Sequence, residues 1–459
     1  MLSLAFIGRL LHINYLNYMK KKIYMLSIIL LMVSITTACT PENDLPGNEQ
    51  PPTYENRGEI QLPMSIFLNN IPAEYAAFKE PLANAISQRE NALAQELGKP
   101  DIKLGFRKTA YLYPSTDVDG NPITLSAIAF WLGYFDNGVW NDLKPDNICL
   151  MEHYTITSDA EAPSNTYPLE MFITGNTLTI MPDYIGYGIT KELPHPYLNH
   201  DVCAINSIDA LTAGYALFND RNRHGMSDGW KLYLAGASQG ASNAIAIHKY
   251  LDIHPELATK WNFASSNCSS GPYSPVATID KYLADGKVVY PVVFPLVMKT
   301  MFDSYPKIMD GFTEEMAYSQ NYLTVKSEID NMLAGKQHNT DAINKVFMDK
   351  VRTTVDSTLA DNEIYLTDIL SPEILDKESP ICKALYQCLE KNDLTKGWTP
   401  IHPMRLHYSS QDMVVPQENS FAILEAFGNN IVTLEQSSIP ADHTTTCSLW
   451  MVELFSKGF

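Results

Sequence analysis

The sequence predicts an α/β fold in which a mostly parallel sheet is flanked by helices and carries an inserted helical cap. Three observations predict this fold. Short apolar segments of strand length alternate with segments of helical period through the first part of the chain. Helical periods then dominate residues 274–398, and strand-like segments return at 404–410 and 429–438. Residues 58–273 and 399–459 are therefore expected to build one core, with 274–398 as its cap.

The individual elements follow from local patterns. Residues 102–117 and 123–134 flank the turn residues 119–122, a pattern typical of a β-hairpin. Further strands are predicted at 147–155, 175–188, 230–236 and 261–273, because each is a short apolar run that ends in turn residues. Helices are predicted at 201–218, directly after 236 up to 251, at 418–428 and at 447–455.

The first 38 residues have the organisation of a secretory signal peptide. Met19 is followed by three lysines, an apolar run at 23–35 and small residues before Cys39. The run is shorter than the ~20 residues of a membrane-spanning helix. Its ending, Thr-Thr-Ala-Cys, resembles a bacterial lipobox, which implies that Cys39 carries a lipid anchor. We therefore expect a bacterial lipoprotein of the outer membrane, on the periplasmic face or the cell surface, with Met19 as the true start. An ordinary secretory signal is the alternative.

Residues 39–57 are polar, acidic and rich in proline, and are expected to form a flexible tether. The chain has 33 basic and 52 acidic residues, a formal net charge of −19. Residues 1–38 hold four of the basic residues and no acidic one, which leaves 29 against 52, or about −23, for the rest. This charge argues against nucleic acid and anionic membranes as partners. The membrane is expected to be a partner only through the lipid on Cys39.

Six cysteines follow Cys39, and an even number permits disulfides in an exported chain without deciding their pairing. Cys382 and Cys388 lie six positions apart in a segment of helical pattern. Six helical residues rise about 9 Å, which is beyond the reach of a disulfide.

The candidate nucleophile is Ser238, in Gly236-Ala237-Ser238-Gln239-Gly240. We call residues 236–240 the elbow. A serine at the apex of a sharp strand-to-helix turn has a strained backbone, and glycines two before and two after it avoid clashes. The backbone N–H of Gln239 is then free to bind an oxyanion. The G-x-S-x-G pattern alone is weak evidence, but its position between a strand and a helix strengthens it. A tight turn with an incidental serine is the alternative.

A serine hydroxyl needs a base within hydrogen-bond reach, and the base needs an orienting carboxylate. Asp412 follows the strand predicted at 404–410, and His443 follows the strand predicted at 429–438, on a loop before the final helix. Asp442 and Glu418 are alternative acids. Asp412 is favoured over Asp442 because adjacent side chains usually diverge.

These motifs resemble those of the α/β-hydrolase superfamily, and within it the lipase and esterase group that includes secretory lipases. The resemblance covers nearly all of residues 58–459, and its carriers are the elbow, the run 182–188, the segments 195–198 and 270–273, and the acid and base loops. It implies the triad order Ser238, Asp412, His443. In the family a His-Gly-Thr turn supplies a second oxyanion donor. The matching residues here are His153, Tyr154 and Thr155, which makes Tyr154 the candidate.

Four further residues are expected to bind substrate. Tyr184 and Tyr273 lie on loops near the predicted site, and Phe294 and Met298 belong to the apolar cap segment 287–312. Most of that segment is expected to form the cap's own core, with a subset walling an acyl pocket. The neighbouring Asp183 is expected to hold the shape of its turn.

The sequence therefore predicts a lipid-anchored serine esterase or lipase for small-molecule esters with a hydrophobic acyl group. A serine peptidase or aminopeptidase is the alternative within the same fold, and an inactive surface-binding lipoprotein is the alternative outside catalysis. No cofactor or metal is expected. Asp117, Asp119 and Asn121 lack the other ligands of a calcium loop, and no zinc, P-loop or dinucleotide pattern occurs.

Overall fold

The structure is a computed structural model that describes residues 53–459, apart from 70–75, 169, 171–174 and 354–358. The predicted signal peptide, Cys39 and the predicted tether up to residue 52 lie outside the described residues. The end of the predicted tether is structured. The Tyr54 hydroxyl donates to the Asp220 carboxylate at 2.6 Å, and strand β1 begins at Glu55. The core therefore starts three residues before the predicted boundary at 58.

The described residues form one large sheet in the order β1-β2-β3-β6-β5-β7-β8-β11-β12, with β4 paired to β3. Pairing is antiparallel from β1 to β6 and parallel from β6 to β12. The strands are β1 (Glu55–Pro63), β2 (Lys103–Thr116), β3 (Pro122–Asp136), β4 (Val139–Asp142), β5 (Asn147–Glu152), β6 (Thr177–Pro182), β7 (Leu232–Ala237), β8 (Phe263–Ser269), β11 (Met404–Tyr408) and β12 (Val432–Gln436). The parallel half carries the strand ends from which the predicted site residues project.

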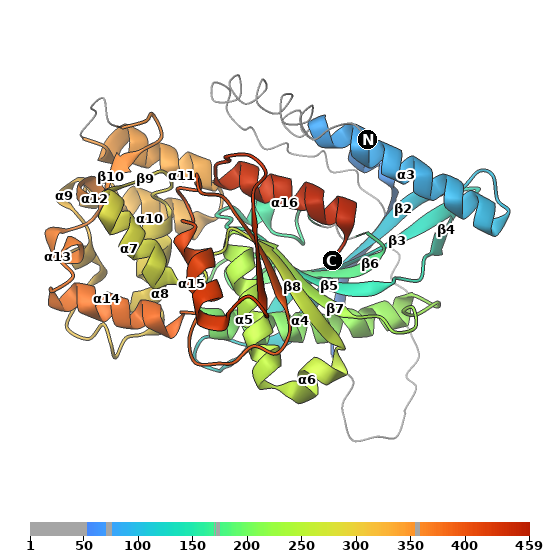
Figure 1. The fold of residues 1–459 in the computed structure, drawn as a ribbon, viewed down its shortest axis with the longest axis horizontal. Helices are drawn as coiled ribbons and strands as arrows, with labels where there is room; N and C mark the ends of the chain where they lie inside the picture. The colour runs from blue at the N-terminus through green and yellow to red at the C-terminus, as the bar shows by residue number, and fades with distance from the viewer. Residues whose placement is uncertain (1–52, 70–75, 169, 171–174, 354–358) are drawn as a thin grey trace.

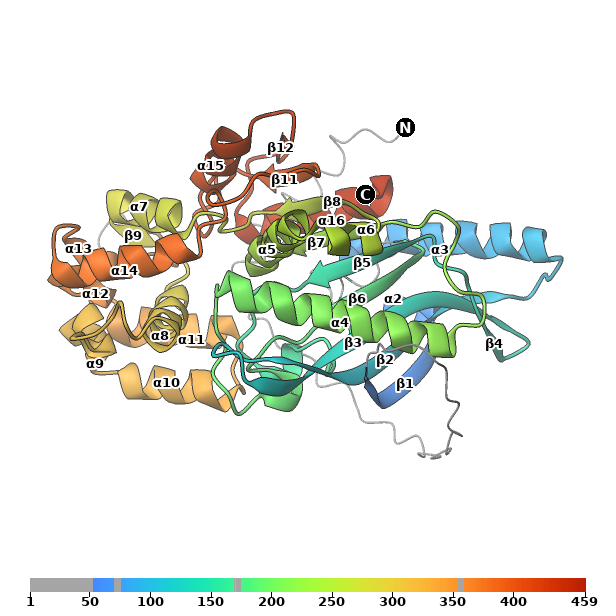
Figure 2. The ribbon, with the colours of Figure 1, turned by 90° about the horizontal axis from the view of Figure 1, so that it is seen from below.

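Helices cover both faces of the sheet (Figures 1 and 2). On one face lie α4 (His200–Arg221), α5 (Gln239–Ile253) and α15 (Glu418–Phe427), and on the other α3 (Ala76–Leu97) and α16 (His443–Lys457). The residues of strand β5 alternate between the two faces of the sheet. Ile148 and Leu150 pack in the hydrophobic core that includes α4 and α5, whereas Cys149 and Met151 pack in the core that includes α16. Alternate side chains of a strand point to opposite faces, so a strand whose central residues are all apolar, such as β5, belongs inside a doubly covered sheet.

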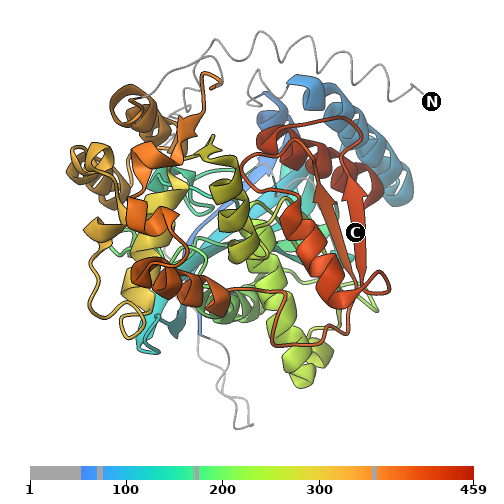
Figure 3. The same ribbon diagram turned by 60° about the vertical axis from the view of Figure 1, so that its left-hand side comes forward.

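Between β8 and β11 the chain leaves the sheet and forms the cap, which lies beyond the end of the sheet to which β8 runs (Figure 1). In Figure 3 the yellow and orange cap occupies one side of the molecule and the red C-terminal strands the other. Its helices are α7 (Pro275–Asp285), α8 (Val293–Ser304), α9 (Gln320–Leu323), α10 (Lys326–Gly335), α11 (Thr340–Val346), α12 (Leu366–Ile369), α13 (Pro372–Leu375) and α14 (Pro380–Lys391). The cap has its own hydrophobic core, which includes Phe294, Ile329 and Phe347.

The cap is mainly helical, in agreement with the predicted helical insertion, and it also contains one short pair of strands. Strands β9 (Lys287–Val288) and β10 (Ile364–Tyr365) pair antiparallel and so join the two ends of the cap segment that holds α8 to α11. The core also contains α2 (Met64–Asn69) and α6 (Pro255–Lys260). Within the part of the chain that is described, no helix combines the length and apolar character needed to cross a bilayer.

The structure describes six cysteines, and all are free thiols: Cys149, Cys203, Cys268, Cys382, Cys388 and Cys447. Cys382 and Cys388 both lie on the continuous helix α14, in agreement with the prediction that the helical rise keeps them apart.

Candidate active site

The elbow has the strand, sharp turn and helix that the sequence predicted. Strand β7 ends at Ala237, α5 begins at Gln239, and Ser238 between them has φ 57° and ψ −125°. A positive φ at a serine costs about 1–3 kcal/mol and persists only where the surroundings enforce it. The glycines are required by space. A Cβ added to Gly236 would lie 2.3 Å from the Gly240 carbonyl oxygen, and one added to Gly240 would lie 2.1 Å from the Glu152 carbonyl oxygen.

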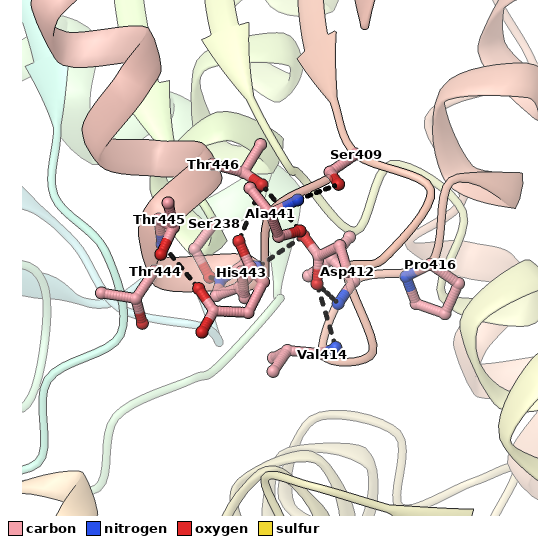
Figure 4. Close-up of polar contacts among 12 residues, drawn as sticks. Ser238, Ser409, Asp412, Val414, Pro416, Ala441, His443, Thr444, Thr445 and Thr446 are labelled. Carbon is pink, nitrogen blue, oxygen red and sulfur yellow. Dashed lines mark hydrogen bonds and ion pairs between the residues drawn. The ribbon is translucent and has the colours of Figure 1, made fainter. Parts of the chain in front are cut away.

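The structure brings Ser238, His443 and Asp412 together in one chain of hydrogen bonds (Figure 4). His443 Nε2 lies 2.8 Å from Ser238 Oγ, and His443 Nδ1 lies 2.8 Å from Asp412 Oδ2. A carboxylate can only accept, so Nδ1 carries the imidazole proton and Nε2 presents its lone pair to the serine hydroxyl. This is the tautomer that a general base for Ser238 needs.

The turn after β11 holds the Asp412 carboxylate in place. Its Oδ1 accepts hydrogen bonds from the backbone N–H groups of Val414 (3.0 Å) and Val415 (2.8 Å), which leaves Oδ2 for His443. The side chain is only 1% exposed, whereas that of His443 is 14% exposed. A buried carboxylate with three hydrogen-bond donors is fixed in position.

Asp442 has another task. Its side chain accepts from the Thr445 backbone N–H at 2.9 Å and caps the N-terminus of α16. The sequence placed His443 on a loop and began the last helix at residue 447. The structure instead makes His443 the first residue of α16, because the helix begins directly after its cap at Asp442. The predicted alternative acid is therefore the residue that starts the helix carrying the base.

Two candidate oxyanion donors lie on adjacent segments. Gln239 is the first residue of α5, so no carbonyl within that helix can accept its backbone N–H. The turn of His153, Tyr154 and Thr155 follows β5, and the carbonyl oxygens of Glu152 and His153 lie closest to the Cβ position of Gly240. The turn therefore runs directly beside the elbow. Tyr154 is 45% exposed, and the candidate donor at this position is its backbone N–H.

An apolar cavity opens at Ser238 and extends into the cap. The volume of the cavity, including its opening to solvent, is about 750 Å³. The cavity is lined by residues that include Ser238 and Thr155 from the core and Tyr282, Phe294, Met298 and Leu385 from the cap. The two cap residues predicted to wall an acyl pocket, Phe294 and Met298, thus line the same cavity as the candidate nucleophile.

The two tyrosines predicted to bind substrate do not line this cavity. Tyr184 is buried, has φ 68°, and donates its hydroxyl hydrogen to the His153 carbonyl oxygen at 3.2 Å. Tyr273 is fully buried in the core shared by the sheet, α4 and α5. The sequence located both near the site, but a loop position does not show whether a side chain faces the cavity or the core.

Two acidic residues, Asp183 and Asp117, close turns, which for Asp183 is the role predicted from the sequence. Asp183 accepts from the Ser126 hydroxyl at 2.5 Å and the Ser164 backbone N–H at 2.8 Å, and burial raises the pKa of its carboxyl to about 6. Asp117 accepts from the backbone N–H groups of Asp119 and Asn121 in the β2–β3 hairpin. Both patterns are side-chain closures of a turn.

One group of described residues has the side-chain types of a metal site: His407, Glu435 and Glu453. Cations already compensate its carboxylates. Arg405 donates to both oxygens of Glu435 at 2.6 and 2.9 Å and contacts Glu453 at 3.4 Å, and Lys457 pairs with Glu453. The group is best described as an ion-pair cluster that joins β11, β12 and α16.

A scan against protein-family models finds no match for this chain, and a search of curated proteins finds none. Solved structures do match. The rice cell wall degrading esterase LipA from Xanthomonas oryzae superposes with a TM-score of 0.62 at 21% identity, over 80% of this chain and 94% of that chain. A candidate hydrolase from Legionella pneumophila gives 0.61 at 18%, over 88% and 96%. This chain has the α/β-hydrolase fold. The fold class predicted from sequence is thereby confirmed.

In the α/β-hydrolase fold the triad residues follow one another as nucleophile, acid and base. Ser238 after β7, Asp412 after β11 and His443 after β12 have that order, and the geometry described above joins them. Sequence reasoning gave no role to His195, although it belonged to one of the segments that carried the family resemblance. Its position beside the residue after the nucleophile becomes visible only in three dimensions.

Proposed function

We propose that this protein is a serine hydrolase that cleaves carboxylic esters through an acyl-enzyme on Ser238. The observation that supports this proposal is the continuous contact from Ser238 Oγ through His443 to Asp412, at the mouth of an apolar cavity. Structures similar to this chain include an esterase, which agrees with the proposal and does not by itself establish the activity.

The reaction follows from the tautomer of His443, whose Nδ1 carries the proton and whose Nε2 is free to accept one. His443 Nε2 takes the hydroxyl proton as Ser238 Oγ attacks the ester carbonyl carbon, and Asp412 stabilises the imidazolium that forms. The carbonyl oxygen becomes an oxyanion, for which the backbone N–H groups of Gln239 and Tyr154 are the proposed donors. His443 then gives its proton to the leaving alcohol as the C–O bond breaks. Water, deprotonated by the same nitrogen, attacks the acyl carbon. His443 returns that proton to Ser238 Oγ as the acyl C–O bond breaks, which releases the acid and restores the serine.

The cavity supports an ester with a hydrophobic acyl group. Its walls are mostly apolar side chains from α7, α8 and α14, and apolar walls bind an acyl chain by removing it from water. The excess of acidic residues over basic ones disfavours an anionic substrate on electrostatic grounds.

The test is a panel of nitrophenyl acyl esters and aminoacyl anilides, assayed on the folded domain together with labelling by a fluorophosphonate probe. Ester turnover with labelling would support the proposal. Turnover of the anilides alone would replace it by a peptidase, which can use the same triad. Absence of both turnover and labelling would favour a binding protein that retains the fold.

Cap substitutions are expected to change acyl-length preference. Phe294→Ala and Met298→Ala should each shift relative kcat/KM between long and short esters by about 1–3 kcal/mol, because a lost apolar contact affects only chains that reach it. Phe421→Ala is a matched control, since this exposed phenyl ring makes an edge-to-face contact with Tyr408 and does not line the cavity. An acyl-length profile that no cap substitution alters would show that the cap is purely structural.

We also propose that the protein is a lipid-anchored bacterial lipoprotein, on the strength of the lipobox-like segment before Cys39. Cys39→Ser should move the protein from the membrane fraction to the soluble fraction, and mass spectrometry of the native protein should find lipid on Cys39. A mature chain that begins at another residue without a lipid would contradict this expectation.

A further inference from the structure

Three aromatic rings form a stacked column beside the elbow. The rings of His153 and Tyr184 are 4.0 Å apart between centroids and inclined by 27°, and those of Tyr184 and His195 are 5.8 Å apart and inclined by 11°. The side chains of His153 and Tyr184 are buried, and that of His195 is half-buried. The column connects two segments distant in sequence, the turn after β5 and the segment between β6 and α4. None of the three rings lines the cavity.

At one end of the column, His195 holds the side chain of Gln239. His195 Nδ1 lies 2.8 Å from the Ile185 carbonyl oxygen, which can only accept, so Nδ1 carries the proton. His195 Nε2 is therefore an acceptor, and it lies 2.7 Å from the Gln239 side-chain nitrogen, which donates to it. Gln239 is buried and directly follows Ser238. This bond fixes the rotamer of the residue whose backbone N–H is the first proposed oxyanion donor.

At the other end, Tyr184 and His153 hold the turn that contains the second proposed donor. The Tyr184 hydroxyl donates to the His153 carbonyl oxygen at 3.2 Å, and His153 Nδ1 donates to the Tyr154 carbonyl oxygen at 2.7 Å. Tyr184 has φ 68°, which is an outlier for a bulky aromatic residue and needs enforcement by its surroundings. The nearby Gly186 lets this segment pack closely against His195, because a Cβ at Gly186 would lie 2.8 Å from the His195 backbone.

Burial keeps both imidazoles neutral. It lowers the pKa of His195 to about 3, with a further lowering from the nearby Lys336 charge, and it lowers the pKa of His153 to about 4. The acceptor on His195 Nε2 therefore persists at every pH where an unshifted histidine would titrate.

From this geometry we propose that His195 and Tyr184 are positioning residues that set the separation of the two oxyanion donors, Gln239 and Tyr154. The proposal rests on the proposed ester hydrolysis at Ser238. Neither residue touches the reacting atoms. His195 acts through the Gln239 side chain, and Tyr184 acts through the His153 carbonyl.

The test uses His195→Phe, which keeps an aromatic ring and removes the acceptor, and Gln239→Leu, which keeps the backbone N–H and removes the side-chain donor. Removal of an oxyanion donor costs about 10²–10³-fold in kcat, so its misplacement should cost roughly 10–100-fold here. KM should change less than threefold. The double variant should lose no more than the larger single loss, because both substitutions remove the same Gln239–His195 hydrogen bond, which can be lost only once. Tyr184→Phe should lower kcat by a smaller factor, about 3–10-fold.

The matched control is His200→Phe. His200 is buried, and like that of His195 its Nδ1 donates to a backbone carbonyl, that of Asn392, at 2.7 Å. It should lower the melting temperature without lowering kcat. A trifluoromethyl ketone, which forms the tetrahedral adduct, should bind the His195 and Gln239 variants more weakly by the same factor as kcat/KM falls.

Unchanged kcat in a folded His195→Phe or Gln239→Leu protein, additive losses in the double variant, or an equal kcat loss in His200→Phe would each overturn the proposal. If His195→Phe does not fold, Gln239→Leu tests the same bond from its other partner. Failure of the underlying function is a separate result, because wild-type protein would then neither turn over esters nor take the fluorophosphonate label.

Discussion

Ser238→Ala is expected to lower kcat/KM for nitrophenyl esters by more than about 10³-fold and to abolish fluorophosphonate labelling. The methyl group cannot form the acyl-enzyme, and the residual rate comes from binding and the oxyanion donors alone. Steady-state kinetics with a mass measurement of the labelled peptide would check both parts.

The structure offers a matched control for this serine. Ser448→Ala makes the same change on α16, where the hydroxyl donates to the Thr444 carbonyl oxygen near the surface, and it should leave kcat close to that of the wild type. Labelling that persists in Ser238→Ala would mean that another residue reacts with the probe, and the proposed mechanism would be wrong.

Asp412→Asn is expected to lower kcat by about 10⁴-fold while the protein stays folded. The reason is geometric. Oδ1 accepts from the N–H groups of Val414 and Val415, so the amide oxygen must stay there and the NH₂ must face His443 Nδ1. His443 then presents a lone pair at Nδ1 and carries its proton at Nε2. In that tautomer it cannot accept the Ser238 proton.

Asp442→Asn is the paired control, and it should retain most of the activity, because asparagine caps a helix as well as aspartate does. Kinetics of both variants, with thermal unfolding as a check on folding, decides between the two acids. If Asp442→Asn were the crippling change and Asp412→Asn mild, the roles assigned to the two carboxylates would have to be exchanged.

Sequence was sufficient for the elbow because its signal is local. A strand, a glycine-flanked serine and a helix follow one another within residues 230–251, so no tertiary information is needed. Asp412 and His443 were accessible for a related reason: parallel strands place the residues after their carboxyl ends at the same edge. What sequence could not supply was the direction of each side chain. Asp442 has the same carboxylate chemistry as Asp412. Only the structure shows that its side chain accepts from the Thr445 backbone N–H at the N-terminus of α16, whereas Asp412 contacts His443 Nδ1 as the orienting acid.

Other elements were missed for physical reasons. Helix α3 has few buried apolar residues, Leu82, Ile86 and Leu93, at spacings of four and seven. That is a helical signal, but a sparse one in a polar segment. The pair β9–β10 has two residues per strand, and such a short ladder is defined by its long-range partner and not by a local pattern. Tyr184 and Tyr273 show the same limit at the site, since an apolar run predicts burial without predicting against what.

The arrangement of the chain has a consequence for the newly made protein. Ser238 lies near the middle of the sequence, whereas its base is the first residue of the last helix, α16. That helix is tied to the strand after the nucleophile, because the Trp450 indole N–H donates to Asn267 on β8 at 2.8 Å. A polypeptide still emerging from the ribosome therefore contains Ser238 long before the residue proposed to take its proton. Under the proposed function, activity can appear only when translation is almost complete.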